Sequence, residues 1–70
     1  MAKDQPNAIA KARQNAGLTQ SRLAAKLGIA RTLLVKYERG GSVPNAVRAI
    51  QIAQALDVRV EDLWATRIHR

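Results

Sequence analysis

Seventy residues with a net charge of +7 and 47% hydrophobic residues predict one small domain, which can bury only about 60% of the surface of its unfolded chain. The absence of cysteine excludes disulfide bonds and thiolate metal sites. No apolar run approaches the roughly 18 residues of a membrane span, and no signal peptide is recognisable, so we expect a soluble, cytoplasmic protein.

Helical spacing of apolar residues and the placement of turn residues predict an all-α fold of five helices. The expected helices are residues 7–16, 20–27, 30–39, 46–56 and 60–66. Gly17, Gly28 and the pair Gly40–Gly41 should end the first three helices. Thr19 and Asn45 should cap the second and the fourth. A single domain is expected over residues 1–70, with an N-terminal arm at 1–6 and a flexible tail at 67–70.

Apolar residues three and four positions apart predict the inward face of each helix. The expected inward residues are Ile9, Ala12 and Ala16 in the first helix, Leu23, Ala24 and Leu27 in the second, Ala30, Leu34 and Tyr37 in the third, Ala46, Ala49, Ile50, Ala53 and Leu56 in the fourth, and Leu63 in the fifth.

Positive charge is concentrated in the middle of the chain. Between Gln5 and Leu56 there are eight Lys or Arg residues and one acidic residue, Glu38. Such a basic body indicates a negatively charged partner, either nucleic acid or an anionic membrane, with a merely solubilising basic surface as the remaining interpretation. Short helices separated by glycine suit a globular core better than a membrane-surface helix, so we do not expect a membrane partner.

The most informative segment is TQSRLAAKLGIARTLLVKYERG, from Thr19 to Gly40. Two helices joined by a short turn that contains glycine must cross steeply, and one residue at the crossing has to be small. Ala24 supplies the small residue. Gly28 can adopt the left-handed backbone conformation that the sharp turn requires. The segment therefore predicts a helix-turn-helix unit.

These residues resemble the helix-turn-helix domains of the phage lambda repressor, Cro and xenobiotic-response-element (XRE) type. Gln20, Ala24, Gly28 and Leu34 stand at the first, fifth, ninth and fifteenth positions of the motif, and GLTQ, LAAKLGI, KYERG and IAQALDV follow the usual wording of the family. The resemblance covers about 55 residues and implies a compact, five-helix, lambda-repressor-like domain. Its third helix would enter the major groove of double-stranded DNA.

The resemblance also implies which side chains contact DNA. In the third helix, Thr32, Lys36 and Arg39 share the face opposite the expected core, with Arg31 and Val35 beside them. The expected base-reading residues are Arg31, Thr32, Val35 and Lys36, where Val35 is our addition because it can pack against a thymine methyl group. The expected phosphate contacts are Gln20, Arg22, Arg39, Asn45 and Arg48, of which all but Arg22 follow from the resemblance.

Charge alone points to Arg22 and Arg31. Both stand in the first turn of a helix, where the helix dipole disfavours a cation by about 0.3–1 kcal/mol at low salt. A bound phosphate or an electronegative base edge would reverse that interaction. We therefore expect both residues to face DNA; a tolerant protein surface is the alternative.

Two further assignments concern structure and assembly. In the family the glutamate of YERG pairs with an arginine of the first helix, so the resemblance implies a largely buried pair of Arg13 and Glu38, with a solvated glutamate as the alternative.

Family members often dimerise through the last helix. The expected dimer interface is Val60, Trp64 and Ile68, although Trp64 could equally be a lid on the core.

The expected function is a sequence-specific DNA-binding transcriptional regulator, a repressor that binds a pseudo-palindromic operator as a homodimer in association with the nucleoid. An antitoxin with a toxin partner, a restriction-modification controller and a protein-interaction module that no longer binds DNA are the alternatives. The sequence holds no nucleophile and base pair, no metal-ligand spacing and no phosphate-binding loop. We therefore expect no enzyme activity, metal, cofactor or small-molecule ligand.

Overall fold

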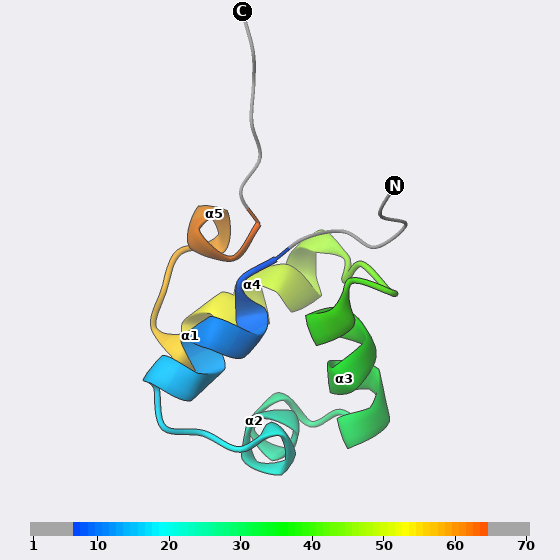
Figure 1. Ribbon diagram of the computed structural model, residues 1–70. Helices are drawn as coiled ribbons and strands as arrows, with labels where there is room; N and C mark the ends of the chain where they lie inside the picture. Colours follow the sequence, from blue (N-terminus) through cyan, green and yellow to red (C-terminus); the bar gives the residue numbers. More distant parts are fainter. Residues whose placement is uncertain (1–6, 65–70) are drawn as a thin grey trace, which may run out of the picture.

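The computed structural model describes residues 7–64, which form five α-helices and no strand within this range. The helices are α1 (Ile9–Asn15), α2 (Gln20–Leu27), α3 (Arg31–Arg39), α4 (Ala46–Leu56) and α5 (Val60–Leu63) (Figure 1). The predicted all-α, five-helix fold is therefore confirmed. The expected arm at 1–6 and tail at 67–70 lie outside the described residues.

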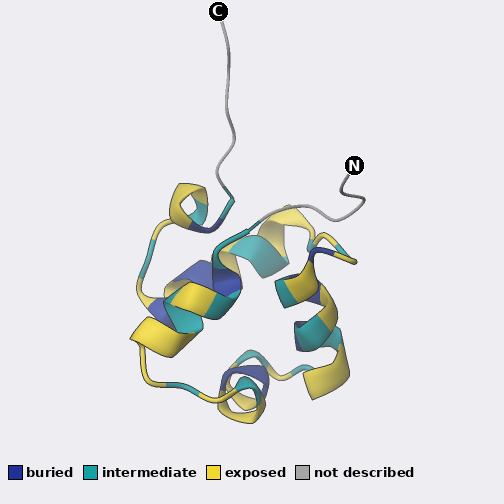
Figure 2. Cartoon of the chain, viewed as in Figure 1, coloured by how far each residue is buried: buried dark blue, intermediate teal, exposed yellow. Residues whose placement is uncertain are grey.

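All five helices contribute to one apolar core. Its buried members are Ile9, Leu23, Ala24, Leu34, Tyr37, Ile52, Ala53, Leu56 and Leu63. Figure 2 shows the buried segments facing the centre of the molecule and the exposed ones on its outside. Within residues 7–64 no polar or charged residue belongs to this core.

The ends of the helices follow the predicted turn and cap residues. Thr19 Oγ1 accepts a hydrogen bond from the backbone N–H of Arg22 (3.1 Å), and Asn45 Oδ1 accepts one from the N–H of Arg48 (2.8 Å). Both predicted N-caps are confirmed, and each satisfies a backbone donor that the first turn of a helix leaves without an intrahelical partner.

Three helices are shorter than predicted, and of these α3 differs by one residue because it begins at Arg31. α1 begins at Ile9 because Asn7 stays outside the helix, where its Oδ1 accepts the N–H of Ile9 (3.0 Å) and its amide donates to the carbonyl of Tyr37 (2.8 Å). α5 ends at Leu63, since Trp64 has an extended backbone (φ −122°, ψ 99°). The bond from the Asn7 amide to Tyr37 joins the start of α1 to the end of α3. The extended backbone at Trp64 places this residue outside α5.

Four residues that were expected to face inward are exposed. Ala16 and Ala30 stand outside the helices, as the C-cap of α1 and the N-cap of α3, so helical spacing does not apply to them. On α4 the prediction for Ala46 and Ile50 is wrong: Ile50 is 49% exposed, whereas Ile52 is fully buried. α4 has apolar residues on two of its faces. Packing against the other helices buries the face that contains Ile52.

The face of α4 that points away from the core carries large apolar side chains that are exposed to solvent. Val47 and Ile50, together with Val43 in the preceding loop, are exposed large apolar side chains. None of the helices in the described part of the chain is long and apolar enough to cross a membrane.

Candidate nucleic-acid interface

The turn between α2 and α3 is built around Gly28. Gly28 has a positive φ of 70°, and the N–H of Ile29 bonds to the carbonyl of Ala24 (3.0 Å), which closes the end of α2. A Cβ atom at Gly28 would meet nothing within 4 Å, so glycine serves the left-handed backbone and not a close contact. Ala30 is extended (φ −69°, ψ 143°), and α3 begins at the next residue.

The two helices cross steeply over a small residue. Figure 1 views α2 nearly along its axis, whereas α3 runs within the plane of the picture. Ala24 is buried, as are Leu23 on the same helix and Leu34 and Tyr37 on α3. The predicted helix-turn-helix is therefore present, and its apolar contacts hold α3 with one face against the core.

The opposite face of α3 is polar and exposed. Arg31, Thr32, Lys36 and Arg39 are all exposed, and Val35 beside them is half-buried. Leu33 is partly buried and packs against the core. The four predicted base-reading residues and Arg39 thus share one side of a nine-residue helix.

A chain of side-chain bonds links the interior to this face. Arg13 Nε donates to Glu38 Oε2 (2.7 Å), and the two side chains are only 12% and 6% exposed. Arg13 Nη1 donates to the carbonyl of Leu18 (2.8 Å). Gln20 Nε2 donates to the other carboxylate oxygen, Glu38 Oε1 (3.1 Å), and Gln20 Oε1 accepts from Arg31 Nη2 (3.2 Å). The pair of Arg13 and Glu38 is therefore in contact and largely buried.

The predicted phosphate contacts lie in three places, one of which is the end of α3, where Arg39 is the last residue. Arg22 is exposed in the first turn of α2, near Gln20 at its start. Asn45 is exposed at the start of α4, while Arg48 is half-buried and its Nε donates to Gln51 Oε1 (3.0 Å). The first turns of α2, α3 and α4 contain no acidic residue. The positive dipole ends of these helices therefore have no acidic residue within their own first turns.

The acidic residues Glu61 and Asp62 occupy the first turn of α5 instead. Asp62 Oδ2 accepts the N–H of Arg59 (3.2 Å), which caps a helix whose N-cap residue, Arg59, is not Ser, Thr, Asn or Asp. Glu61 lies 3.7 Å from Arg59 on the open surface. These carboxylates serve the local structure of α5.

The predicted dimer residues are only partly described. Val60 and Trp64 are half-buried and pack against the core of their own chain. Trp64 follows α5 in an extended conformation, so it does not continue a helical stripe with Val60. Ile68 lies outside the described residues.

Sequence reasoning missed the bond from Arg31 to Gln20 and three further side-chain contacts that join more distant residues. These three are the bond from Asn7 to α3, the bond from Gln20 to Glu38, and a bond of 3.2 Å from Lys26 Nζ to the carbonyl of Ala55 that joins α2 to α4. Each joins residues at least 18 positions apart. The spacing of residues along a single helix does not predict such contacts, because they join different helices.

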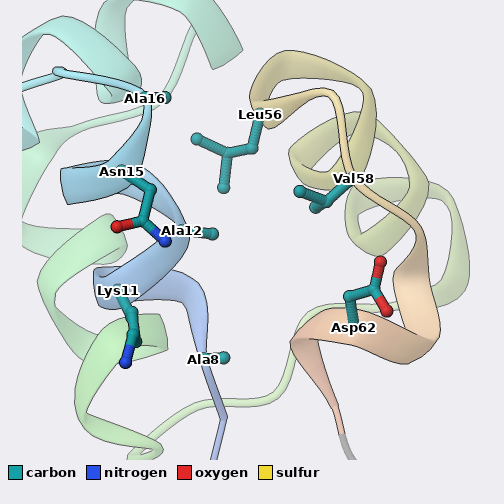
Figure 3. Close-up of a pocket in the computed structure, with 8 residues that line it drawn as sticks. All are labelled: Ala8, Lys11, Ala12, Asn15, Ala16, Leu56, Val58 and Asp62. Carbon is teal, nitrogen blue, oxygen red and sulfur yellow. The ribbon is translucent and has the colours of Figure 1, made fainter.

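A groove of about 400 Å³ lies on another part of the molecule, between α1 and the connection from α4 to α5 (Figure 3). Alanine side chains line the α1 side, Leu56 and Val58 project toward them, and Lys11, Asn15 and Asp62 add polar groups. No residue of α2 or α3 lines it. Among the described residues no cluster of His, Cys, Asp or Glu could hold a metal ion.

Residues 9–63 match the sequence profile of the family described as helix-turn-helix. The chain is 34% identical over 61 residues to the cryptic phage CTXphi transcriptional repressor RstR of Vibrio cholerae, a match that covers 83% of this chain and 54% of that repressor. The chain thus corresponds to about half of that relative's length.

Two solved structures are similar in both fold and sequence. The restriction-modification controller protein C.AhdI from Aeromonas hydrophila superposes with a TM-score of 0.71 at 30% identity, over 77% of this chain and 82% of that one. The N-terminal DNA binding domain of SinR from Bacillus subtilis gives a TM-score of 0.69 at 28% identity, over 89% and 90%.

Proposed function

This chain belongs to the helix-turn-helix family of DNA-binding transcription regulators, and on that premise we propose that it is a repressor that binds a pseudo-palindromic operator as a homodimer. Residues 1–70 act in this proposal as one DNA-binding domain. Each protomer inserts α3 into the major groove while α2 crosses the phosphate backbone.

The exposed face of α3 carries the proposal. Arg31, Lys36 and Arg39 supply three cations on one side of the helix, and the single carboxylate of α3, Glu38, is paired with Arg13 and only 6% exposed. DNA approaching this face therefore meets positive charge and hydrogen-bond donors without a repelling carboxylate. That combination suits an anionic groove edged by base acceptors.

We propose separate roles for the side chains around this face. Arg31, Thr32, Val35 and Lys36 read base edges, because arginine and lysine can bond guanine O6 and N7 and the smaller side chains can contact a thymine methyl. Gln20, Arg22, Arg39, Asn45 and Arg48 bind phosphates and set the register of the protein on the duplex. The cap bond of Asn45 uses only its side-chain oxygen, which leaves its amide as a phosphate donor.

Dimerisation follows from the geometry of such operators. Two copies related by a two-fold axis place their α3 helices in successive major grooves, about 34 Å apart. Val60, Trp64 and Ile68 are the proposed contact between protomers. Analytical ultracentrifugation of Trp64→Ala, with and without operator DNA, tests this surface, and an unchanged dimer would contradict it.

Selection of bound sequences from random duplex oligonucleotides is the direct test of the function. An inverted repeat with half-sites one helical turn apart is expected. If the dimer neutralises six to ten phosphates, the affinity should fall roughly 10³- to 10⁵-fold between 50 and 200 mM salt. Absence of binding at low salt, or binding that ignores salt, would contradict the proposal, and absence of binding would favour a protein-interaction module.

Single variants separate base reading from phosphate binding. Lys36→Ala should weaken discrimination at one base pair, whereas Arg39→Ala should weaken binding to all sequences alike. Val35→Ser should lose a preference for thymine at one position while the fold is kept. Unchanged base preference in both Lys36→Ala and Val35→Ser would contradict the assigned face.

A second candidate within the same chemistry is a restriction-modification controller, which the similarity to C.AhdI favours. An antitoxin that pairs with a toxin is a related possibility. The bound operator discriminates among them: a site upstream of methyltransferase and endonuclease genes supports the controller, one upstream of a toxin gene supports the antitoxin, and a site elsewhere supports the repressor.

A further inference from the structure

The groove between α1 and the connection from α4 to α5 lies beside the last described residues. The backbone N–H of Ala8, which lines the groove, donates to the carbonyl of Leu63 (2.8 Å), so the chain leaves the described fold at one end of the groove (Figure 3). We propose that residues 65–70, which we call the C-terminal segment, bind along this groove of their own chain through Ile68. The docked segment competes with the contact of Ile68 between protomers, and this second part rests on the proposed function.

The groove presents apolar side chains that stay partly open to solvent. Ala12 on α1 and Val58 on the opposite side are both half-buried and point toward one another (Figure 3). The volume of about 400 Å³ falls within the roughly 300–1,000 Å³ of typical ligand pockets, so a large side chain fits. Ile68 is the only large apolar residue of the C-terminal segment. Its burial against Ala12 and Val58 removes apolar surface of all three residues from water.

The C-terminal segment is long enough to reach the middle of the groove. Four residues of a helix advance about 6 Å, so Ala12 lies about one turn beyond Ala8 along α1. Ile68 follows Trp64 by four residues, which span up to about 13 Å when extended. This length allows the chain to turn back beside α1 and still place Ile68 at Ala12.

Charge complementarity also favours this segment. Asp62 lines the groove on its α5 side, and an ionised carboxylate has acceptor sites for more than one donor. The C-terminal segment carries Arg67 and Arg70 and no acidic residue. Lys11 lies on the α1 side of the groove and repels these arginines, so they pair on the side of Asp62.

The covalent connection favours docking within one chain over docking on a partner. A linker of a few residues gives a tethered group an effective concentration in the millimolar range. Three residues, Ala65 to Arg67, join Ile68 to Trp64 at the end of the groove. The C-terminal segment of a second copy, at micromolar concentration, competes weakly with this tethered one. The occupant is therefore the segment of the same chain.

Docking has a consequence for assembly. A docked Ile68 side chain is unavailable to a second copy, whereas the proposed contact between protomers uses it together with Val60 and Trp64. Only the undocked fraction of the protein is then competent to form that contact, and the apparent dissociation constant of the dimer rises as this fraction falls. The groove thus limits dimerisation of the free protein.

Introduced cysteines test the docking in the full chain, because the protein has none of its own. A disulfide requires Cα atoms about 4.4–6.8 Å apart. The pair Ala16→Cys and His69→Cys places one thiol in the groove and one in the C-terminal segment, and it leaves Ile68 in place. Oxidation at a concentration below that of dimerisation should give an intramolecular disulfide, identified by non-reducing electrophoresis and mass spectrometry.

Two controls show whether Ile68 directs this reaction. Gln14→Cys, on an exposed part of α1 outside the groove, should react with His69→Cys at least about ten-fold more slowly than Ala16→Cys does. Adding Ile68→Ser to the first pair should slow its reaction to the rate of this control. Equal rates at Gln14 and Ala16, or no effect of Ile68→Ser, overturn the docking. So does a mixture of the two single-cysteine chains, Ala16→Cys and His69→Cys, that reacts as fast as the double variant, because the partner's groove would then be the site.

Filling the groove tests the competition. Ala12→Leu should exclude the C-terminal segment and lower the apparent dissociation constant of the dimer at least about three-fold, measured by analytical ultracentrifugation. In an Ile68→Ala background the same substitution should change that constant by less than about two-fold, because the two residues act through one contact. Unchanged or weaker dimerisation of Ala12→Leu overturns the competition.

Failure of the docking and failure of the proposed function are distinguishable. Absence of any dimer, with and without operator DNA, refutes the proposed homodimer, whereas the cysteine reaction in the single chain still decides whether the C-terminal segment is docked. Selection of an operator by the unchanged protein supports the function whichever rate the cysteines show.

Discussion

The helix-turn-helix half of the molecule (residues 7–40) and the α4–α5 half (residues 45–64) are stabilised by different kinds of polar contact. In the first half, the bonds of Glu38 with Arg13 and with Gln20, and that of Gln20 with Arg31, join residues 25, 18 and 11 positions apart. In the second half, the side chains of Asn45, Arg48, Arg59 and Asp62 bond to partners two or three positions away.

This difference indicates what each half requires. Long-range polar bonds orient α1, α2 and α3 relative to one another, in addition to their apolar packing. The second half lacks such side-chain pairs among its own residues, and its orientation depends on apolar burial, on the bond from Lys26 to Ala55 and on a backbone bond from the N–H of Ala8 to the carbonyl of Leu63 (2.8 Å). The half with the long-range polar bonds is the one that carries the proposed base-reading face.

The largest expected effect is that of removing the shared carboxylate. Glu38→Ala should lower the free energy of unfolding by about 3–5 kcal/mol, because Arg13 would keep a buried charge without its partner. The control Glu61→Ala breaks an exposed pair in the other half and should change that free energy by about 0–1 kcal/mol. Urea denaturation followed by circular dichroism measures the free energy of unfolding of both variants. Equal losses of this free energy would contradict the difference between the two halves.

Two isoleucines on α4 test whether the second half depends on apolar burial. Ile52→Ala should lower the free energy of unfolding by about 2–5 kcal/mol, since the side chain is fully buried. Ile50→Ala, two residues away and about half exposed, should stay within about 0.5 kcal/mol of the unchanged protein. A larger loss at Ile50 would mean that the other face of α4 packs inward in solution.

The N-caps should show where the two halves are alike. Thr19→Ala and Asn45→Ala each remove one local bond to a backbone N–H, so each should lower the thermal midpoint by the equivalent of about 1 kcal/mol. If one of the two substitutions lowered the thermal midpoint several times more than the other, the view that these local contacts act independently of the long-range ones would be contradicted.

The smallest expected effect is a gain. Ala30 is the N-cap of α3 in the extended conformation that a cap needs, but it has no side-chain hydrogen bond to offer. Ala30→Ser should therefore raise the free energy of unfolding by about 0.5–1 kcal/mol. The control Ala16→Ser, at the C-terminal end of α1, should bring no gain. A loss of stability in Ala30→Ser would show that this site cannot hold a cap bond.

Local features made much of the fold predictable. Thr19, Asn45 and Gly28 each act through bonds or dihedral angles within a few residues, so their effect is visible in the sequence. The steep crossing over Ala24 follows from the same short-range rules. The exposed face of α3 was predictable too, because helical spacing alone separates Lys36 from Leu34.

Errors arose where local rules allowed two answers. α4 carries two apolar stripes of equal spacing, and only packing against its neighbours selects Ile52 over Ile50. Ala16 and Ala30 were assigned to the core on helical spacing, although each lies one position outside its helix. The length of α5 was likewise overestimated, because nothing in its composition marks the extended backbone at Trp64.

The sequence by itself therefore determined the five helices, the N-caps Thr19 and Asn45, the helix-turn-helix register and the cationic face of α3, since all of these depend on residues within about one or two turns. Only the tertiary structure decided which side of α4 is buried and how Gln20 connects Glu38 to Arg31. Those features depend on side chains that meet across helices, and such meetings are set by the packing of the whole core.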